Sequence, residues 1–465
     1  MSGQRLSVLV VAANASTRWG GEAILPLHIF RGLRKAGHDA WMCVGNETKP
    51  ELDELLGADA QRVSYVEDAQ MHSAFRWIQP RIPSRMGNPL YYTQVLVTQW
   101  RQRDAAAQLV KKLGIDVVHQ PTPISPRVPS LLVDLPAPLV IGPMNGGMEY
   151  PPGFRFLQPR GLRGVKNLAR GLANALPRRV DAKRQAECLI VANQRTQDGL
   201  PSGVRGRIFR MVENGVVPEL WARGLADGVA DSTTVNRSFE IIFIGRLVRW
   251  KGPEWLIEAL ARACTQVDCK LKIVGDLQGE RHRLAERVSK LRIESRVEFL
   301  GWQSQERCAE LLSKADIMVL PSVQDAGATV VLEAMACGKA VIAVKWGGPA
   351  DILDDSCGIL IEPRDPARLV ADLEQAIVSL ANDRNRCARM GRAGRAKVLA
   401  EYTWPMKIER FVEIYREAIR RRAANLAELE VPKHNKVSEK EPHPALRSCS
   451  PRDEGRSPQP RSHRY

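Results

Sequence analysis

Residues 321–338 read Pro-Ser-Val-Gln-Asp-Ala-Gly-Ala-Thr-Val-Val-Leu-Glu-Ala-Met-Ala-Cys-Gly and lie between two short apolar runs, 315–320 and 340–343. The apolar runs predict buried parallel strands, and the segment between them predicts a loop followed by an apolar helix. A strand, a loop and a helix that return to a parallel strand form the unit of a doubly wound sheet. The stretch therefore predicts an α/β fold.

The same alternation continues on both sides of this stretch. Further strands are predicted at 6–13, 39–44, 116–119, 137–141, 188–192, 208–212, 239–245, 271–275, 297–301 and 358–361. The restart of the pattern after a polar stretch predicts two domains. We expect five parts: an N-terminal Rossmann-like domain (1–220), a linker (221–238), a C-terminal Rossmann-like domain (239–402), a long amphipathic helix (403–430) and a disordered tail (431–465).

Composition limits the partners of the chain. The 465 residues carry a formal net charge of +16, which favours nucleic acid, anionic lipid or phosphate-bearing substrates. The nine cysteines include no Cys-x-x-Cys pair, which predicts a reducing, cytoplasmic setting. There is neither a convincing signal peptide nor a run of 18 apolar residues, so we expect no transmembrane helix.

Two acids in the opening stretch are candidates for ligand binding. The N-terminus of the predicted helix offers unpaired N–H groups around Ala328, Thr329 and Val330, which suit a pyrophosphate. Glu333 lies about one turn into the helix and is placed to bind ribose hydroxyls, whereas Asp325 lies before the helix and is placed to face a sugar. The alternative is an exposed acid and a half-buried acid without a function.

A second candidate is the loop Gly245–Gly252, which follows a predicted strand. Its cations Arg246 and Lys251 are suited to neutralise a diphosphate leaving group. The alternative is a pair of surface cations without a function. The 321–338 stretch, which predicts a ligand site of its own, argues against this alternative.

These motifs resemble the retaining GT-B glycosyltransferases of family GT4. Residues 321–343 resemble the E-x7-E region of that family, with Asp325 in the place of its first glutamate, and residues 245–252 match its G-R-L-x-x-x-K-G motif. Gly20-Gly21 and Asn214-Gly215-Val216 match a glycine loop and a turn of the family, so that the resemblance covers about 1–425. It implies two Rossmann-like domains that face a central cleft, with a C-terminal helix that crosses back.

The resemblance also assigns roles to individual residues. It implies catalytic roles for Arg246, Lys251 and Asp325. The donor-binding residues that it implies are Gly21, Asn145, Gly245, Arg246, Lys251, Asp325, Ala328, Thr329, Val330 and Glu333, and the acceptor-side residues are Gly20, His119 and Asn145. Asn145 stands where many relatives carry a histidine, and His119 is a candidate either for an acceptor contact or for a simple strand end.

The implied function is the transfer, with retention, of a hexose-type sugar from a UDP- or GDP-sugar to a glycan or lipid-linked acceptor, in bacterial cell-surface polysaccharide synthesis. We expect no metal and no cofactor besides the nucleotide-sugar co-substrate. A catalytically impaired sugar-nucleotide-binding or membrane-associated scaffold is the alternative.

Two basic segments bear on the location of the chain. Residues 75–103 contain five arginines, and residues 151–180 contain seven arginines and lysines. Both segments are interleaved with aromatic or apolar residues, and neither contains an acid. They predict a peripheral contact with an anionic membrane surface, or else helices whose basic faces are solvated. No nucleic-acid recognition motif is present, so we expect no nucleic-acid partner.

Overall fold

The computed structural model describes residues 4–19, 21–67, 87–158, 180–222, 237–275 and 280–430. The predictions for Gly20, for most of the 221–238 linker, for the 431–465 tail and for large parts of the two basic segments lie outside these residues. Residues Met1–Ala423 form one compact unit, and the description below concerns the part of that unit that the structure describes.

The N-terminal half of this unit is built on a parallel sheet. Within the described residues it contains seven strands in the order β3-β2-β1-β4-β5-β6-β7. Their bounds are β1 Ser7–Val11, β2 Asp39–Gly45, β3 Val63–Val66, β4 Val117–Gln120, β5 Leu139–Met144, β6 Cys188–Val191 and β7 Arg207–Arg210. Val8 pairs with Ala40 on one side and with Val117 on the other, so the strand order reverses between β1 and β4.

The C-terminal half repeats this plan. The described residues of this half form a parallel sheet of six strands in the order β10-β9-β8-β11-β12-β13. The bounds are β8 Phe239–Ile244, β9 Cys269–Val274, β10 Val297–Gly301, β11 Ile317–Leu320, β12 Ala340–Val344 and β13 Gly358–Ile361. Here the order reverses between β8 and β11, and ligands bind such sheets at the carboxyl ends of strands beside a reversal.

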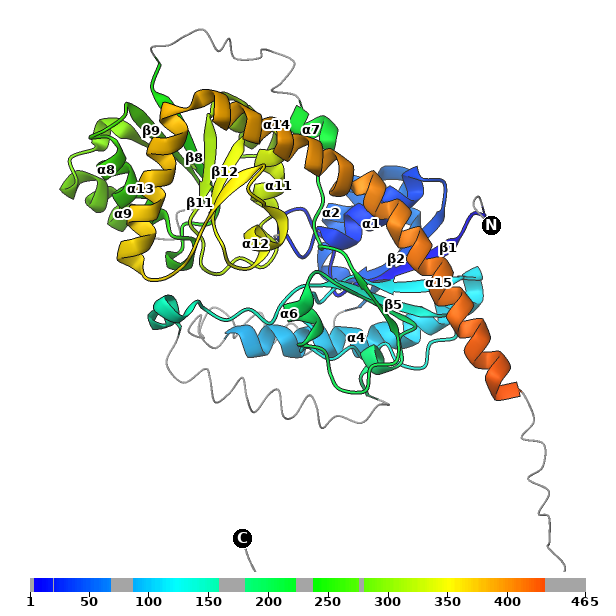
Figure 1. The fold of residues 1–465 in the computed structure, drawn as a ribbon. Coiled ribbons are helices and arrows are strands. Elements are labelled where there is room, and N and C mark those ends of the chain that lie inside the picture. The colour runs from blue at the N-terminus through cyan, green and yellow to red at the C-terminus, as the bar shows by residue number, and fades with distance from the viewer. Residues whose placement is uncertain are drawn as a thin grey trace, which may run out of the picture. The chain divides into compact units, whose positions relative to one another are not determined.

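Helices flank both sheets (Figure 1). The first half carries α1 Leu25–Lys35, α2 Lys49–Leu56, α4 Gly87–Leu113 and α6 Gln194–Gln197. Helix α7, Pro218–Ala222, follows in the chain, and its Trp221 is buried in the core of the second domain. The second half carries α8 Pro253–Ala263, α9 Glu280–Lys290, α10 Gln305–Lys314, α11 Thr329–Ala336, α12 Gly348–Ile352, α13 Pro366–Asn382 and α14 Arg384–Glu401, and α15 Trp404–Glu430 follows. Local sequence fixes several starts; for example, the side chain of Asp365 accepts the N–H of Arg368 at 2.9 Å, and Pro366 opens α13.

Helix α15 returns to the first domain and packs against it. Val216 makes two backbone hydrogen bonds at the start of α15. Its N–H donates to Tyr402 O (2.9 Å), and its carbonyl oxygen accepts the N–H of Trp404 (3.0 Å). Further along α15, Phe411 and Tyr415 are buried in the core that also contains strand β1. The predicted return of the C-terminal helix is therefore confirmed.

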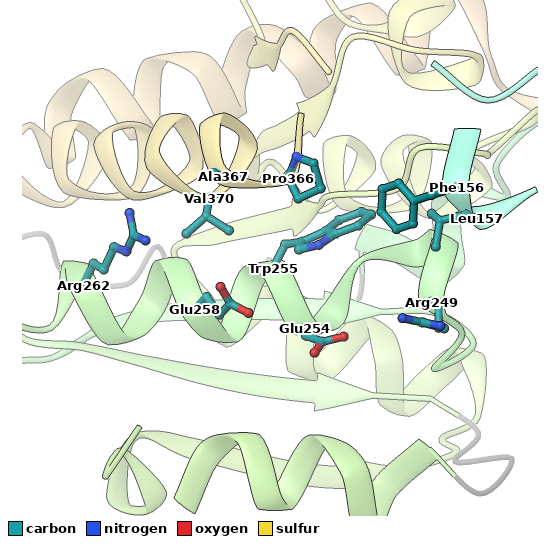
Figure 2. A pocket seen from close by; sticks show the side chains of 10 residues that line it. All are labelled: Phe156, Leu157, Arg249, Glu254, Trp255, Glu258, Arg262, Pro366, Ala367 and Val370. Carbon is teal, nitrogen blue, oxygen red and sulfur yellow. The ribbon is translucent and has the colours of Figure 1, made fainter. Parts of the chain in front are cut away.

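A segment of the first half is attached to the second domain. Tyr150 and Phe154 belong to the core of the second domain, and the Phe154 ring lies 4.9 Å from that of Trp255. Figure 2 shows Phe156 beside Trp255 and Pro366, at a cavity of about 360 Å³ that α8 and α13 also line. Residues 150–157 are thus a link between the domains that the sequence did not indicate.

Among the helices of the described ranges, none is long and apolar enough to span a membrane.

Candidate functional site

A cavity of about 600 Å³ lies at the carboxyl ends of β1 and β8, where the two domains meet. It brings together nine of the residues predicted to bind the donor: Gly21, Gly245, Arg246, Lys251, Asp325, Ala328, Thr329, Val330 and Glu333. Two other predicted residues, Asn145 and His119, do not line it.

Two loops of the second domain contact each other beside the cavity. One loop follows β8, and the other, residues 321–328, follows β11; residues 325–328 of the second loop are called the donor loop below. The N–H of Val323 donates a hydrogen bond to Trp250 O at 2.9 Å and so joins the two loops. Gly252 has a φ of 75°, and a Cβ on it would lie 2.5 Å from Pro321 O. The glycine therefore permits both the turn and the close approach of the two loops.

The charges of these loops are paired across the contact. Lys251 Nζ donates a hydrogen bond to Asp325 Oδ2, and both side chains are mostly buried. The other oxygen, Asp325 Oδ1, accepts the N–H of Ala328 at 3.1 Å. Asp325 thus holds both Lys251 and the start of α11, whereas Arg246 is exposed at the cavity wall.

Helix α11 points its N-terminus at the cavity. Its N-cap residue, Ala328, has a φ of 44°, a left-handed conformation that is uncommon for alanine. The Asp325 contact supports this turn. The first N–H groups of a helix have no partner within it, so the start of α11 at Thr329 and Val330 is suited to an anion.

Glu333 lies on the cavity side of α11. It is half-buried, and burial raises the pKa of its carboxyl to about 7. A carboxyl in such a place favours ligands that donate hydrogen bonds to its ionised form. Sugar hydroxyls are donors of this kind.

The structure places Asn145, predicted to bind the donor, behind the cavity wall. Its side chain is buried, with 4% exposed, and its amide nitrogen donates to both carboxylate oxygens of Glu213 (3.0 and 2.9 Å) and to Ala326 O (2.8 Å). Both amide hydrogens are thus used within the protein, and a contact of Asn145 with the donor stays a prediction.

The structure places His119, predicted either on the acceptor side or as a simple strand end, inside the fold. The ring is fully buried; Nε2 contacts Gly142 O at 2.5 Å and Nδ1 contacts the Tyr415 hydroxyl at 2.7 Å. Burial lowers the pKa of His119 to about 4. His119 therefore joins the first sheet to α15 as a neutral side chain.

Three ionisable residues near the cavity were missed by sequence reasoning. Glu22 lines the cavity and accepts the N–H of Ile124 at 2.9 Å. Glu213, which also lines it, is almost fully buried, and burial raises the pKa of its carboxyl. Lys407 of α15 lies beside Glu213, and burial lowers the pKa of its ammonium to about 7. Glu22 and Glu213 directly adjoin two matched motifs, which was the signal available in the sequence.

No group of three His, Cys, Asp or Glu side chains in the described ranges is arranged to hold a metal ion.

Comparison with known proteins gives these features a context. Residues 230–397 match the family model described as glycosyl transferases group 1. The chain is 34% identical over 194 residues to N-acetyl-alpha-D-glucosaminyl L-malate synthase of Bacillus anthracis, a match that covers 42% of this chain and 48% of the relative. It is also 34% identical over 197 residues to the GDP-mannose-dependent monoacylated alpha-(1-6)-phosphatidylinositol monomannoside mannosyltransferase of Corynebacterium glutamicum, covering 40% and 48%. The chain thus spans about half the length of the curated relatives it matches.

Solved structures extend the likeness to the whole fold. The structure of Anabaena Alr3699/HepE in complex with UDP superimposes with a TM-score of 0.60 at 19% sequence identity, over 88% of this chain and 99% of that chain. At this identity the match concerns the fold. It confirms the expected GT-B arrangement of two Rossmann-like domains.

Proposed function

We propose, from the match of residues 230–397 to the model of glycosyl transferases group 1, that the chain transfers a hexose-type sugar from a UDP- or GDP-sugar to a glycan or lipid-linked acceptor. The observation that carries the proposal is the cavity in which Arg246, Lys251, Asp325, Glu333 and the start of α11 converge. The names of the relatives support a sugar transfer, and they support either base, since one of them uses GDP-mannose and one similar fold holds UDP.

In the proposed reaction the donor half of the cavity holds the nucleotide diphosphate. Arg246 and Lys251 stabilise the negative charge that grows on the diphosphate as the sugar–oxygen bond breaks, and the N–H groups at Thr329 and Val330 bind its oxygens. Glu333 accepts hydrogen bonds from the ribose. Asp325 positions Lys251 and faces the sugar.

The acceptor hydroxyl enters from the first domain. On that side Gly21, Glu22 and Ile124 line the cavity. Retention of configuration and independence from metal are proposed from the resemblance to family GT4 and from the two cations, which supply charge that a metal supplies elsewhere. Bacterial cell-surface polysaccharide synthesis is the proposed setting.

A peripheral membrane location completes the proposal. Trp100, exposed to 61%, lies beside Arg101 and Arg103 on α4. An aromatic ring next to cations suits the surface of an anionic bilayer, where a lipid-linked acceptor would be found.

A sugar-nucleotide-binding protein without catalysis is the second candidate. It is favoured by the ion pair of Lys251 with Asp325, because this pair already uses the cation that the reaction needs. Both candidates bind nucleotide; only the enzyme releases it from the sugar.

The test is a thermal-shift panel of UDP-, GDP- and ADP-sugars, followed by an assay of nucleotide release with the best of them. A ligand present at a hundred times its Kd stabilises the folded state by about 2.7 kcal/mol, so we expect a clear rise in Tm for a UDP- or GDP-sugar. Failure of all the sugars at millimolar concentration would refute the donor site. A rise in Tm without any nucleotide release would favour the binding protein.

A further inference from the structure

One side-chain amide at the edge of the cavity connects three segments of the chain. Asn145 follows β5, Glu213 precedes the turn into the second domain, and Ala326 belongs to the donor loop. The Asn145 amide nitrogen has two hydrogens: one faces the Glu213 carboxylate (3.0 and 2.9 Å) and the other the Ala326 carbonyl (2.8 Å). The first domain thereby holds the loop that carries Asp325.

The orientation of this amide is fixed from its other side. Asn145 Oδ1 accepts a long hydrogen bond from Arg195 at 3.4 Å, and the backbone N–H of Asn145 donates to Ile124 O at 2.8 Å. With the oxygen turned to Arg195, the nitrogen is turned to Glu213 and Ala326. The arrangement is therefore specified by four partners.

Glu213 also touches the donor loop by packing. A Cβ added to Gly327 would lie 2.3 Å from Glu213 Oε1 and 2.7 Å from Asn214 Nδ2, so the loop rests on these side chains only because residue 327 is glycine. Lys407 stabilises the buried carboxylate electrostatically, and its Nζ donates to Val212 O, next to Glu213 in the chain. Glu213 is therefore anchored on the first domain and on α15.

From these contacts we infer that Asn145 and Glu213 are a positioning pair, which fixes the donor loop at the place where Asp325 and the start of α11 meet the nucleotide sugar. Ala326 adjoins Asp325, which in turn contacts Lys251 and Ala328 N. A shift of Ala326 therefore moves the paired charges and the helix start together. Misplacement of reacting groups by about 1 Å can cost about a hundredfold in rate. The inference rests on the proposed function for its effect on turnover, and on the geometry alone for its effect on the loop.

The alternative is that these contacts only hold the two domains together. In that case, loss of any contact between the domains should affect the donor loop equally. The chain offers a matched control in Asp351, which accepts a hydrogen bond from Asn193 at 2.7 Å and pairs with Arg195 at 3.5 Å. These contacts also join the first half to the second, but through α12. Asp351→Ala therefore weakens the junction without removing a direct contact of Ala326 or Gly327. It leaves in place the contacts of Arg195 with Asn145 Oδ1 and Gly146 O, and the hydrogen bond from Gly348 N, at the start of α12, to Asp325 O.

The experiment compares Asn145→Ala, Gly327→Ala and Asp351→Ala with the unaltered chain. Hydrogen exchange of the ligand-free proteins is measured for peptides that cover residues 321–336, and turnover is measured as nucleotide release from UDP-glucose and GDP-mannose. We expect faster exchange in Asn145→Ala and Gly327→Ala at Ala328 and Val331, whose N–H groups donate to Asp325 Oδ1 and Ala328 O. We also expect a fall in kcat of about tenfold to a hundredfold with a smaller change in KM. Asp351→Ala should change neither exchange at this loop nor kcat.

A double variant separates the pair from its contact with the loop. Asn145→Asp with Glu213→Gln restores a hydrogen bond between the two side chains, because the glutamine amide now donates to the aspartate. The ionised aspartate has no hydrogen for Ala326 O, so thermal stability should recover relative to Asn145→Asp alone while fast exchange of the loop remains. Gly327→Ala keeps both residues and serves where Asn145→Ala folds poorly.

The outcomes distinguish this inference from the proposed function. If the loop exchanges equally fast in Asn145→Ala, Gly327→Ala and Asp351→Ala, the positioning pair is refuted, whatever the activity. If the unaltered chain neither binds nor turns over a sugar nucleotide, the proposed function fails, while the exchange data still decide whether the pair fixes the loop.

Discussion

The two sides of the cavity use their polar side chains differently. On the second domain, Arg246, Lys251, Asp325 and Glu333 all line the cavity. On the first domain, Gly21, Glu22 and Glu213 also line the cavity, but the two polar side chains predicted to meet ligand, Asn145 and His119, are buried and paired with protein partners. A residue that matches a motif in position can thus lie either at the cavity or in the protein interior. Only its contacts in the structure distinguish the two environments.

The largest expected effect concerns Lys251. Replacement of Lys251 by alanine removes the buried cation of the donor side, and loss of one such stabilising group costs about a hundredfold to a thousandfold in kcat. We expect nucleotide release from the preferred sugar nucleotide to fall by this amount in a steady-state assay. Measurement of Tm alongside shows how far the unpaired Asp325 also destabilises the fold.

Arg249→Ala is the matched control for this change. Arg249 belongs to the same short 3₁₀ helix, Arg249–Lys251, but its side chain faces the smaller cavity beside Trp255 and Phe156 (Figure 2). Its replacement should leave turnover unchanged. Equal losses for the two variants would show that net charge on the loop, and not the place of Lys251, governs the reaction.

A smaller effect is expected from the titration of Glu333. The pKa of its carboxyl is raised to about 7 by burial, whereas hydrogen bonds from ribose favour the ionised form. Binding must therefore release a proton at low pH, so that affinity falls about tenfold per pH unit below about pH 7 and is constant above it. Calorimetry with UDP-glucose across this range measures the slope, since its diphosphate does not titrate there.

Glu333→Gln and a 2′-deoxyribose donor are the controls for that slope. The glutamine does not titrate, so its affinity for UDP-glucose should be independent of pH. The 2′-deoxy analogue should show a weaker dependence on pH because it offers one hydroxyl fewer. An unchanged slope in Glu333→Gln would place the titrating group elsewhere, with Glu213 the nearest candidate on the opposite wall.

The difference between the two sides also explains what the sequence could predict. The strands that carry the sites are apolar runs, and they were found with bounds close to those observed; β3, Val63–Val66, was missed because all four of its residues are only half-buried. The donor side was predictable because its residues lie within a few positions of strand ends, which place them at one edge of the sheet.

The first-domain side was not predictable by this reasoning. The partner of His119, Tyr415, is 296 residues away, and Asn145 and Ala326 are separated by 181 residues. Such contacts depend on how α15 and the second domain pack against the first sheet, which no local pattern encodes. For Glu22 and Glu213 the only signal in the sequence was their position next to matched motifs, because their charge alone does not indicate that they face the cavity.

The smallest effect on turnover is expected for His119, although its effect on stability is large. His119→Leu leaves the Tyr415 hydroxyl and the Gly142 carbonyl without their partner, and each buried group so left costs about 1–3 kcal/mol. We expect a lower free energy of unfolding in denaturant and an unchanged kcat per folded molecule. Tyr415→Phe removes one of the same contacts, so its cost and that of His119→Leu should not add in the double variant.

The dependence on pH separates a buried structural histidine from one that meets ligand. Because burial lowers the pKa of folded His119 to about 4, whereas an unfolded histidine has a pKa of about 6.5, the unfolded chain binds the extra proton first. Stability that depends on the neutral ring is complete above about pH 6.5 and is lost as the pH falls towards about 4. The difference between the unaltered chain and His119→Leu should therefore shrink over this range. A difference that is independent of pH, together with a lower kcat, would return His119 to the acceptor side of the cavity and remove the contrast between the two domains.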